Sequence, residues 1–129
     1  MPLVADQTIT VRNQHYDADA DTDQTYDTVI SGASWYNQLN ARADGGGLQS
    51  AVIAKVRIFA GTALVGTDRA ADSYLSPQDW DTQDNEGRAA HWTLRPGDLL
   101  LRGEDKVTIL AVHDNRGARL NPHWYVEAH

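Results

Sequence analysis

Apolar and polar residues alternate with a period of two along most of the chain, and this pattern predicts β-strands rather than helices. Residues Gln7–Asn13 place Ile9 and Val11 among polar neighbours, which is typical of a half-buried strand. Residues 24–31 resume the pattern with β-branched and aromatic side chains. We therefore expect these two segments to form a hairpin whose tip is residues 17–23.

Two more strand candidates follow in the first half of the chain. Gly32 interrupts the pattern and separates Ala33–Leu39 as a strand of its own. Residues Gln49–Phe59 carry apolar residues on one face at period two, and their β-branched content favours a strand over a helix. Between these strands, Asn40–Gly47 is expected to form a flexible loop. Its three consecutive glycines lack the Lys-Ser or Lys-Thr that completes a phosphate-binding loop.

The last third of the chain contains three further strand candidates. They are Asp98–Arg102, Val107–His113 and His123–Ala128. A hairpin turn at residues 103–106 joins the first two, and residues 114–117 form a second turn. Arg95-Pro96-Gly97-Asp98 is also predicted to be a turn, because Pro presets its own φ and Gly readily adopts a positive φ.

Residues 60–91 form a long, polar and acidic region with only short structural signals. Ser76-Pro77 predicts the cap and first position of a one-turn helix. Loops beyond about 12–15 residues in a compact domain are usually functional or disordered. Tyr74 and Trp80 give this region apolar area to bury, so we expect it to pack on the barrel or on a neighbouring molecule.

With about seven strands and no long helix, the sequence predicts an all-β fold. We expect a small antiparallel β-barrel or sandwich with a long inserted loop around residues 60–91. The 129 residues suit one domain, 1–129, from which an acidic hairpin tip at residues 15–25 projects. No apolar run approaches the ~18–20 residues of a spanning helix, and no secretory signal is visible.

Composition and charge exclude several classes of functional site. The net charge is −7, from 11 Lys and Arg against 18 Asp and Glu, which argues against a protein held mainly by nucleic-acid phosphates. The chain has no cysteine, so disulfides, thiolate nucleophiles and thiolate zinc sites are excluded. Small secreted scaffolds usually need disulfides, so synthesis and folding inside a cell are favoured. The acidity is concentrated in residues 1–27 and 68–86.

The acidic tip has the form D-x-D-x-D-x-D. Its members are Asp17, Asp19, Asp21 and Asp23. A helix-loop-helix calcium site requires Gly at position six and Glu at position twelve, where this chain has Thr22 and Thr28. A solvated or docking tip is therefore favoured over a weak divalent-ion site.

The remaining residues suggest no enzyme chemistry. His113-Asp114 is the arrangement of a base with its orienting carboxylate, but its place at a strand end favours a structural role. No Ser stands in a nucleophile elbow, and no His pair has the helical spacing of a metal motif. We expect no catalytic residue, no metal and no cofactor.

Several motifs stand in a fixed order along the chain. They are Tyr26-x-Thr28-x-Ile30-x-Gly32-Ala33-Ser34-Trp35, Tyr74-x-Ser76-Pro77-x-x-Trp80, Trp92-Thr93-Leu94-Arg95-Pro96-Gly97-Asp98, Asp114-Asn115-Arg116-Gly117 and His123-Trp124-x-Val126. In this order they resemble small minor capsid proteins of tailed bacteriophages, of the head-to-tail connector or head-closure (stopper) type. The resemblance covers nearly the whole chain, and the motif that begins at Trp92 is its most specific part. The Asp-rich start and residues 61–71 depart from it.

The resemblance implies a structural role without catalysis, in the neck of a virion. Such proteins form cyclic rings, with six-fold symmetry favoured and twelve-fold as the alternative. The implied partners are copies of the chain itself, a portal or adaptor ring above and a tail or terminator protein below. Packaged DNA would pass through the channel without sequence-specific binding, and no membrane is involved. The chain would be made in the cytoplasm of the bacterial host.

Two acidic regions and four arginines are the candidate interfaces of such a ring. The first region is Asp17–Asp23 and the second is Asp68–Glu86, with Tyr74 and Trp80 as its aromatic anchors. The arginine candidates are Arg95, Arg102, Arg116 and Arg119. Acidic loops that face a channel would repel DNA phosphates, so that DNA slides. Alternatively, they would dock onto arginine-bearing faces of the next ring.

Other functions remain open at this point. A tail terminator, an adaptor ring and a capsid decoration protein are alternatives within the same virion, although helical adaptors need several amphipathic helices that this sequence lacks. A monomeric β-barrel could bind a small ligand or carbohydrate through its Trp residues. An enzyme would need a pocket with perturbed carboxylates or His, and no residue here singles one out.

Overall fold

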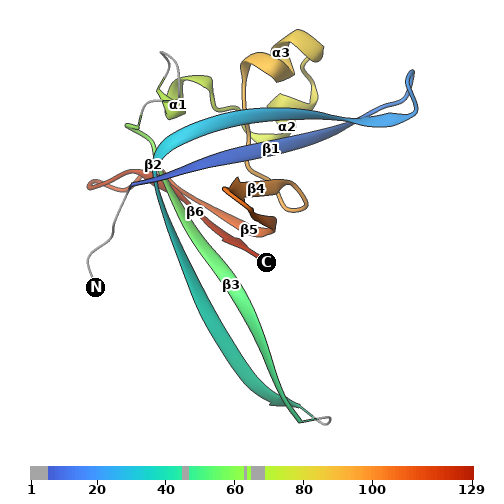
Figure 1. The fold of residues 1–129 in the computed structure, drawn as a ribbon. Coiled ribbons are helices and arrows are strands. Elements are labelled where there is room, and N and C mark those ends of the chain that lie inside the picture. Colours follow the sequence, from blue (N-terminus) through green and yellow to red (C-terminus); the bar gives the residue numbers. More distant parts are fainter. Residues whose placement is uncertain (1–5, 45–46, 63, 65–68) are drawn as a thin grey trace.

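A closed, six-stranded antiparallel β-barrel forms the body of the molecule (Figure 1). The computed structural model describes residues 6–44, 47–62, 64 and 69–129. The strands are β1 Gln7–Asp17, β2 Thr22–Asp44, β3 Gly47–Phe59, β4 Leu99–Arg102, β5 Asp105–Asn115 and β6 His123–Ala128. Around the barrel they follow the order β1-β2-β3-β6-β5-β4, and β4 pairs back onto β1. The predicted all-β class is confirmed, with the barrel as its architecture.

β2 is one long strand that belongs to two hairpins. Its first part pairs with β1 and its second part, from Ser34, pairs with β3. Gly32 has a φ of +76° beside an irregularity in the β1–β2 register, so the chain bends there without ending the strand. The expectation of two separate strands is therefore wrong, and the barrel has six strands rather than seven.

The flexible loop predicted at Asn40–Gly47 is also wrong for its described part. The β2–β3 ladder continues through Asn40↔Ala51 to Asp44↔Gly47, so the chain stays extended almost to the turn. Residues 45–46 of that predicted loop lie outside the described residues. The composition of this segment suggested a loop, but regular cross-strand pairing proceeds through residues 40–44 and 47–51.

Both hairpins extend beyond the barrel, in different directions (Figure 1). β1 pairs with β4 only at Thr10–Arg12, and β3 pairs with β6 only at Ala54–Phe59. Beyond these pairings, each hairpin has no third strand among the described residues. We call residues 13–27 the acidic hairpin and residues 38–53 the long arm.

The barrel interior is filled by alternate residues of its strands. The largest fully buried side chains of the strands are Ile9, Val11, Ile30, Val56, Ile58, Leu100, Ile109, Trp124 and Val126. The apolar face predicted for β3 is confirmed from Ala54 to Ile58. Val52 belongs to the same face but is 51% exposed, because it lies on the long arm.

The segment between β3 and β4 contains three short helices. They are α1 Ala70–Ser73, α2 Pro77–Asp81 and α3 Asn85–Ala90. The Ser76 hydroxyl accepts a hydrogen bond from the Asp79 amide at 3.3 Å and Pro77 begins α2, as the sequence predicts. Asp84 caps α3 in the same way. The region expected to be a long loop is therefore a folded helical insert, although residues 63 and 65–68 lie outside the described part.

None of the helices that the structure describes has the length and apolar character needed to cross a membrane.

Candidate functional site

The most specific sequence motif, Trp-Thr-Leu-Arg-Pro-Gly-Asp, forms a buried polar junction between the insert and the barrel. Asp98 is 3% exposed, and its carboxylate accepts hydrogen bonds from the Asn13 amide at 2.9 Å, the Gln14 backbone N–H at 3.2 Å and Arg95 Nε at 2.8 Å. Asn13 also donates to the Thr93 carbonyl and accepts from the Thr93 N–H. A buried carboxylate with three donors is well satisfied, so this motif is architectural.

Arg95 connects this junction to α2. Its guanidinium donates to the carboxylates of Asp98 and Asp81, at 2.8 and 2.6 Å, and to the Gln14 carbonyl. The same group lies 4.8 Å from the centre of the Trp80 ring. The sequence suggested Arg95 as a partner for acidic loops of a neighbour. In this structure the side chain is 20% exposed and its donors are engaged within the chain.

Trp80 was expected to be an interface anchor and is instead fully buried within the chain, with 0% exposure. Its ring meets those of His15 and Tyr26 edge-on, with centroids 6.0 and 5.5 Å away. Its Nε1 donates to the carbonyls of Arg88 and His91. The interface role is corrected, because the insert folds back and buries its largest apolar side chain against the acidic hairpin.

Two polar contacts add to this support of the acidic hairpin. The Tyr26 hydroxyl donates to Asn85 Oδ1 of α3 at 3.0 Å. Across the hairpin, Arg12 donates to both carboxylate oxygens of Asp27, at 2.8 and 3.0 Å. This bidentate contact lowers the pKa of Asp27 and raises the pKa of Arg12. The hairpin is therefore braced along much of its length.

Two of the four acidic residues predicted at the tip form hydrogen bonds within it. The predicted set is Asp17, Asp19, Asp21 and Asp23. Asp17 accepts from the backbone N–H groups of Asp19 and Ala20, which closes the turn. Asp21 accepts from the Tyr16 hydroxyl, and this hydrogen bond raises the pKa of Tyr16. Within the described ranges, no three His, Asp or Glu side chains are grouped so that they could hold a metal ion.

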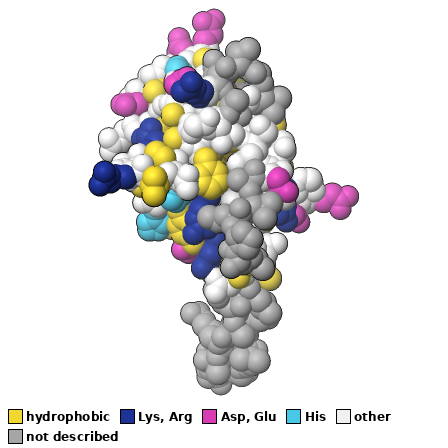
Figure 2. All heavy atoms as spheres, turned by 90° about the vertical axis from the view of Figure 1, so that its left-hand side faces the viewer, with side chains coloured by type: hydrophobic (Ala, Val, Ile, Leu, Met, Phe, Trp, Pro, Cys, Tyr) yellow, Lys and Arg dark blue, Asp and Glu magenta, His cyan; other side chains and the backbone are white. Residues whose placement is uncertain are grey.

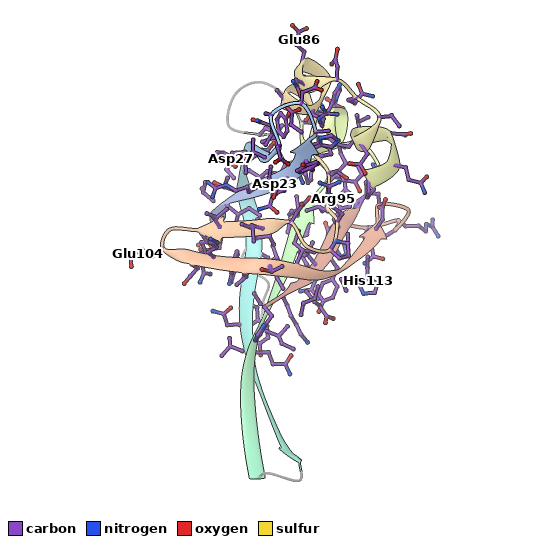
Figure 3. All side chains as sticks on the ribbon, turned by 90° about the vertical axis from the view of Figure 1, so that its right-hand side faces the viewer. Asp23, Asp27, Glu86, Arg95, Glu104 and His113 are labelled. Atoms are coloured by element: carbon purple, nitrogen blue, oxygen red, sulfur yellow. The ribbon has the colours of Figure 1, made fainter. Side chains whose placement is uncertain are left out.

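Figure 3 labels six titratable residues and shows on which elements they lie. Asp23 and Asp27 lie on the acidic hairpin, and Glu86 and Arg95 lie in the neighbouring insert. Glu104 marks the β4–β5 turn, and His113 lies near the outer end of β5. Three of the four labelled carboxylates therefore lie on the acidic hairpin or the insert.

Arg116 covers an aromatic cluster. It pairs with the carboxylate of Asp114 at 2.7 Å, which lowers the pKa of Asp114. Its guanidinium also lies 4.7 Å from the Tyr74 ring and 5.0 Å from the Trp124 ring. Tyr74 in turn packs against Trp92 and Trp124, and burial raises its pKa. Both predicted interface residues, Tyr74 and Arg116, therefore have partners within the chain.

The two remaining arginine candidates differ from each other. Arg102 donates to Asp105 across the β4–β5 turn at 2.8 Å and lies 4.6 Å from the centre of the Trp35 ring. Arg119 is exposed in the loop between β5 and β6, and it makes no hydrogen bond or ion pair with any residue that the structure describes. Of the predicted cations, Arg119 is the one that remains available to a partner.

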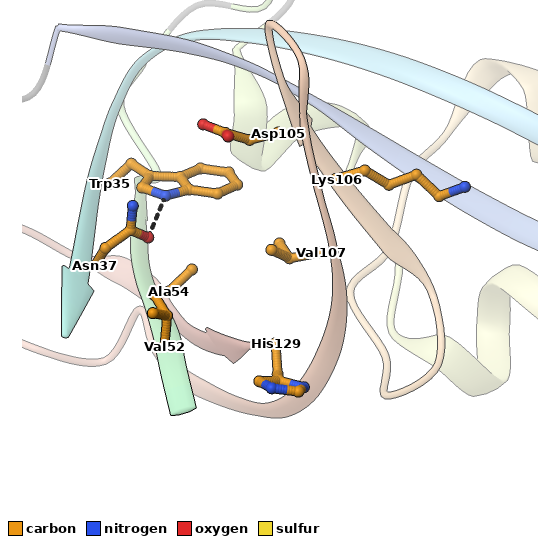
Figure 4. A pocket seen from close by; sticks show the side chains of 8 residues that line it. All are labelled: Trp35, Asn37, Val52, Ala54, Asp105, Lys106, Val107 and His129. Atoms are coloured by element: carbon orange, nitrogen blue, oxygen red, sulfur yellow. Dashed lines mark hydrogen bonds between the residues drawn. The ribbon is translucent and has the colours of Figure 1, made fainter. Parts of the chain in front are cut away.

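A hollow of about 270 Å³ lies at the base of the long arm (Figure 4). Its lining residues are Trp35, Asn37, Val52, Ala54, Asp105, Lys106, Val107 and His129. The Trp35 indole donates to Asn37 Oδ1 at 2.9 Å. Because Val52 and Ala54 share the face of β3 that enters the core, the hollow extends the inner surface of the barrel onto the arm.

A second hollow, of about 400 Å³, lies between the acidic hairpin and α3, and we call it the acidic hollow. Its lining residues are His15, Tyr16, Asp17, Ala18, Asp19, Asp84, Asn85 and Arg88. The carboxylates of Asp17, Asp19 and Asp84 form no ion pair with a described residue. Three carboxylates against one guanidinium, that of Arg88, give this surface a net negative charge that suits a cationic partner.

Sequence reasoning did not identify Asn13 as a member of the buried junction. The signal was present, because Asn13 continues the inward positions Ile9 and Val11 of β1. A polar residue in register with an apolar face indicates a buried hydrogen-bond partner. The partner itself, Asp98, cannot be found from local pattern, since it lies in a distant turn.

Comparison with curated proteins finds no match for the chain. A model described as "Family of unknown function (DUF6751)" matches residues 4–129, which is nearly the whole chain. The barrel, both hairpins and the insert all lie within the matched range. The chain therefore belongs to this family, DUF6751.

Proposed function

We propose that the chain is a structural protein of the neck of a tailed bacteriophage. In this role it is a ring-forming head-closure (stopper) or connector subunit that joins the portal complex to the tail and lines or closes the DNA channel. The order of its sequence motifs supports the proposal, and a closed barrel with projecting hairpins fits a subunit that neighbours complete.

The observation that carries this proposal is the long arm. Among the described residues, the backbone at positions 38–53 pairs only with itself, so both outer edges of the arm carry unpaired N–H and C=O groups. An isolated two-stranded hairpin is at best marginally stable in water. The neighbouring barrel is closed and so protects its own strands from edge pairing. The arm is therefore suited to pair with, or pack against, another chain.

The distribution of charge is compatible with a DNA channel. The chain carries a net charge of −7, and the acidic hairpin places several carboxylates at the end of a braced projection. Carboxylates near DNA repel its phosphates, so DNA would move past them without being held. The acidic hairpin thus suits a surface along which a genome slides.

The test is to locate the chain in phage particles that contain it, by electron microscopy with a label on its C-terminus and a second label on the portal. We expect both labels at the same vertex, where head and tail meet. Particles made without the chain should have heads that lose DNA and tails that do not attach. A label at the far end of the tail or over the capsid surface would favour a terminator or a decoration protein, and absence from particles would overturn the proposal.

A further inference from the structure

We infer that copies of this chain meet head to tail, with the Arg119–Leu120 loop of one copy seated in the acidic hollow of the next. The inference rests on the proposed function, because it specifies how neighbours in the ring contact one another. Each copy carries both surfaces, one cationic and apolar and the other acidic, and the contact joins the first surface of one copy to the second surface of its neighbour.

The projecting partner in this contact is the loop between β5 and β6, residues 116–122. Leu120 is 84% exposed, the largest exposure of any large hydrophobic residue in the described part of the chain. Arg119, beside it, is exposed as well. Asn121 has a φ of +52°, a left-handed conformation that turns the chain directly after Leu120. The loop therefore presents an apolar side chain and a cation together, and interfaces are enriched in Arg.

Arg119 stands apart from the arginines that form ion pairs. Arg12, Arg95, Arg102 and Arg116 each lie within 4.0 Å of a carboxylate of the same chain. In the described structure, Arg119 has neither an ion pair nor an aromatic ring beneath it. Its full charge is therefore available for a carboxylate of another molecule.

The receiving surface is the acidic hollow. The carboxylates of Asp17, Asp19 and Asp84 line it without cationic partners, and Tyr16, which is 54% exposed, adds an aromatic wall. Arg88 also lines the hollow, but it is buried and its terminal nitrogens donate to oxygens of the insert. The hollow therefore offers negative charge and apolar area together, which complements Arg119 and Leu120 in both respects.

The two surfaces lie on opposite sides of the barrel. Figure 1 shows the acidic hairpin extending to one side and the β5–β6 loop to the other. Figure 2 views the molecule from the side of that loop and shows hydrophobic and basic side chains together over its middle, with acidic ones at its margins. Two different surfaces on opposite sides make a heterologous contact, which forms a closed ring when the rotation between neighbours divides a full turn.

Charge reversal in two separate variants tests this contact. Arg119→Glu reverses the charge of the loop, and Asp17→Lys combined with Asp19→Lys reverses the charge of the acidic hollow. We expect either variant alone to self-associate about tenfold more weakly than the wild type, because like charges then meet. An equimolar mixture should recover association, since the reversed loop meets the reversed hollow and each unchanged surface meets its natural partner. Sedimentation at low and high salt measures this, and the effect should shrink as salt rises.

Matched controls come from the β4–β5 turn. Lys106→Glu and Glu104→Lys reverse exposed charges that form no ion pair with a described residue. These variants should associate like the wild type. A mixture that fails to recover, or controls that weaken association equally, would overturn the inference.

Cysteine trapping tests the contact even when assembly is weak, because the chain has no native cysteine. A variant with both Ala18→Cys and Leu120→Cys should give a ladder of dimers, trimers and larger species on mild oxidation. Each single variant should stop at dimers. A variant with Glu104→Cys and Leu120→Cys should give no ladder beyond its background.

The absence of a ladder from the paired variant, or equal ladders from both pairs, overturns the inference. Neither result depends on where the chain lies in a particle. If the chain lies at the neck but gives no ladder, the proposed function stands and the contact is rejected. If the chain gives a ladder but is absent from particles, the contact stands and the proposed function is rejected.

Discussion

The side-chain amide of Asn13 donates to the carboxylate of Asp98 at 2.9 Å, between residues 85 positions apart in the chain. Both residues are buried, and the contact lies just beyond the short β1–β4 ladder at Thr10–Arg12. The barrel closes through this ladder, and the hydrogen bond holds the segment before β4 against β1. A buried polar pair specifies one geometry more strictly than apolar contact does, because a shift leaves a donor or acceptor unsatisfied.

Removal of the Asp98 carboxylate tests this closure. Asp98→Ala leaves the buried donors of Asn13 and Arg95 without their acceptor, so we expect the free energy of unfolding to fall by about 3–5 kcal/mol. The matched control is Asp105→Ala, which breaks the exposed pair with Arg102 and should cost less than about 1 kcal/mol. Urea denaturation of both variants measures the difference. Equal losses would show that the junction has no special part in closing the barrel.

The brace on the acidic hairpin depends on Trp80. Trp80→Ala should cost about 3–5 kcal/mol, because it leaves a cavity where the ring met His15 and Tyr26. Hydrogen exchange should also show that amides of the acidic hairpin lose protection before those of the barrel. The control is Trp35→Ala, at a partly exposed ring near the other hairpin. It should leave protection of the acidic hairpin unchanged, and a loss there in both variants would contradict the brace.

Local pattern was enough to predict much of the barrel. The alternation in β3 identified the inward residues correctly from Ala54 to Ile58, because period two maps directly onto the two faces of a strand. The turn before β4 was also correct. Asp98 N–H donates to the Arg95 carbonyl at 3.2 Å, and Gly97 has a φ of +95°.

The helical insert shows where local pattern is insufficient. Its polar and acidic composition suggested a loop, and Trp80 suggested an anchor for a neighbour. Trp80 is instead buried by residues of the acidic hairpin, which are distant in the sequence and become neighbours only when the barrel has formed. The partners of Arg95 could not be predicted for the same reason, because Gln14 and Asp81 are distant from it in the sequence. Arg119 was predicted as an interface residue together with the paired arginines, and nothing in its local sequence distinguished it from them.

A substitution at Gly97 tests whether the turn that leads into β4 requires a glycine. Gly97→Ala places a Cβ on a residue with a φ of +95°, and we expect a loss of about 1–2 kcal/mol, although nothing lies within 4 Å of that Cβ. Gly61→Ala is the control, because its surroundings are equally open and its φ is outside the left-handed region. That variant should be unchanged or slightly more stable. Equal effects, read from thermal and urea unfolding, would remove backbone conformation as the reason for glycine at position 97.

Acidification should weaken the fold through two exposed ion pairs. Hydrogen bonds from Arg12 and Arg116 lower the pKa values of Asp27 and Asp114 in the folded chain. A lowered pKa means that folding favours the charged form, so the stabilisation is present above the usual carboxyl pKa of about 4 and is lost as the pH falls through the folded value. Because both pairs are substantially exposed, each contributes about 1 kcal/mol or less.

The variant with Asp27→Asn and Asp114→Asn should therefore lose stability at pH 7 and lose less on going from pH 5 to pH 3 than the wild type. Asp19→Asn, at a carboxylate without an ion pair among the described residues, should keep the wild-type dependence. Urea unfolding at several pH values measures both. A steeper dependence in the double variant would contradict the assigned sign.

Shortening the long arm separates folding from assembly. Leu39 and Val52 stand opposite each other in the register, so residues 40–51 can be replaced by Asn-Gly as a two-residue turn. We expect the barrel to keep its melting temperature within a few degrees, because β3 still pairs with β6 and the core is unchanged. Incorporation into particles should be lost, since the unpaired backbone edges of the arm have been removed. Gln49→Ser, which leaves the paired backbone of the arm in place, is the control and should be incorporated normally. Should shortening unfold the barrel, the arm belongs to the domain's own stability, and the observation that carries the proposed function no longer points to a neighbour.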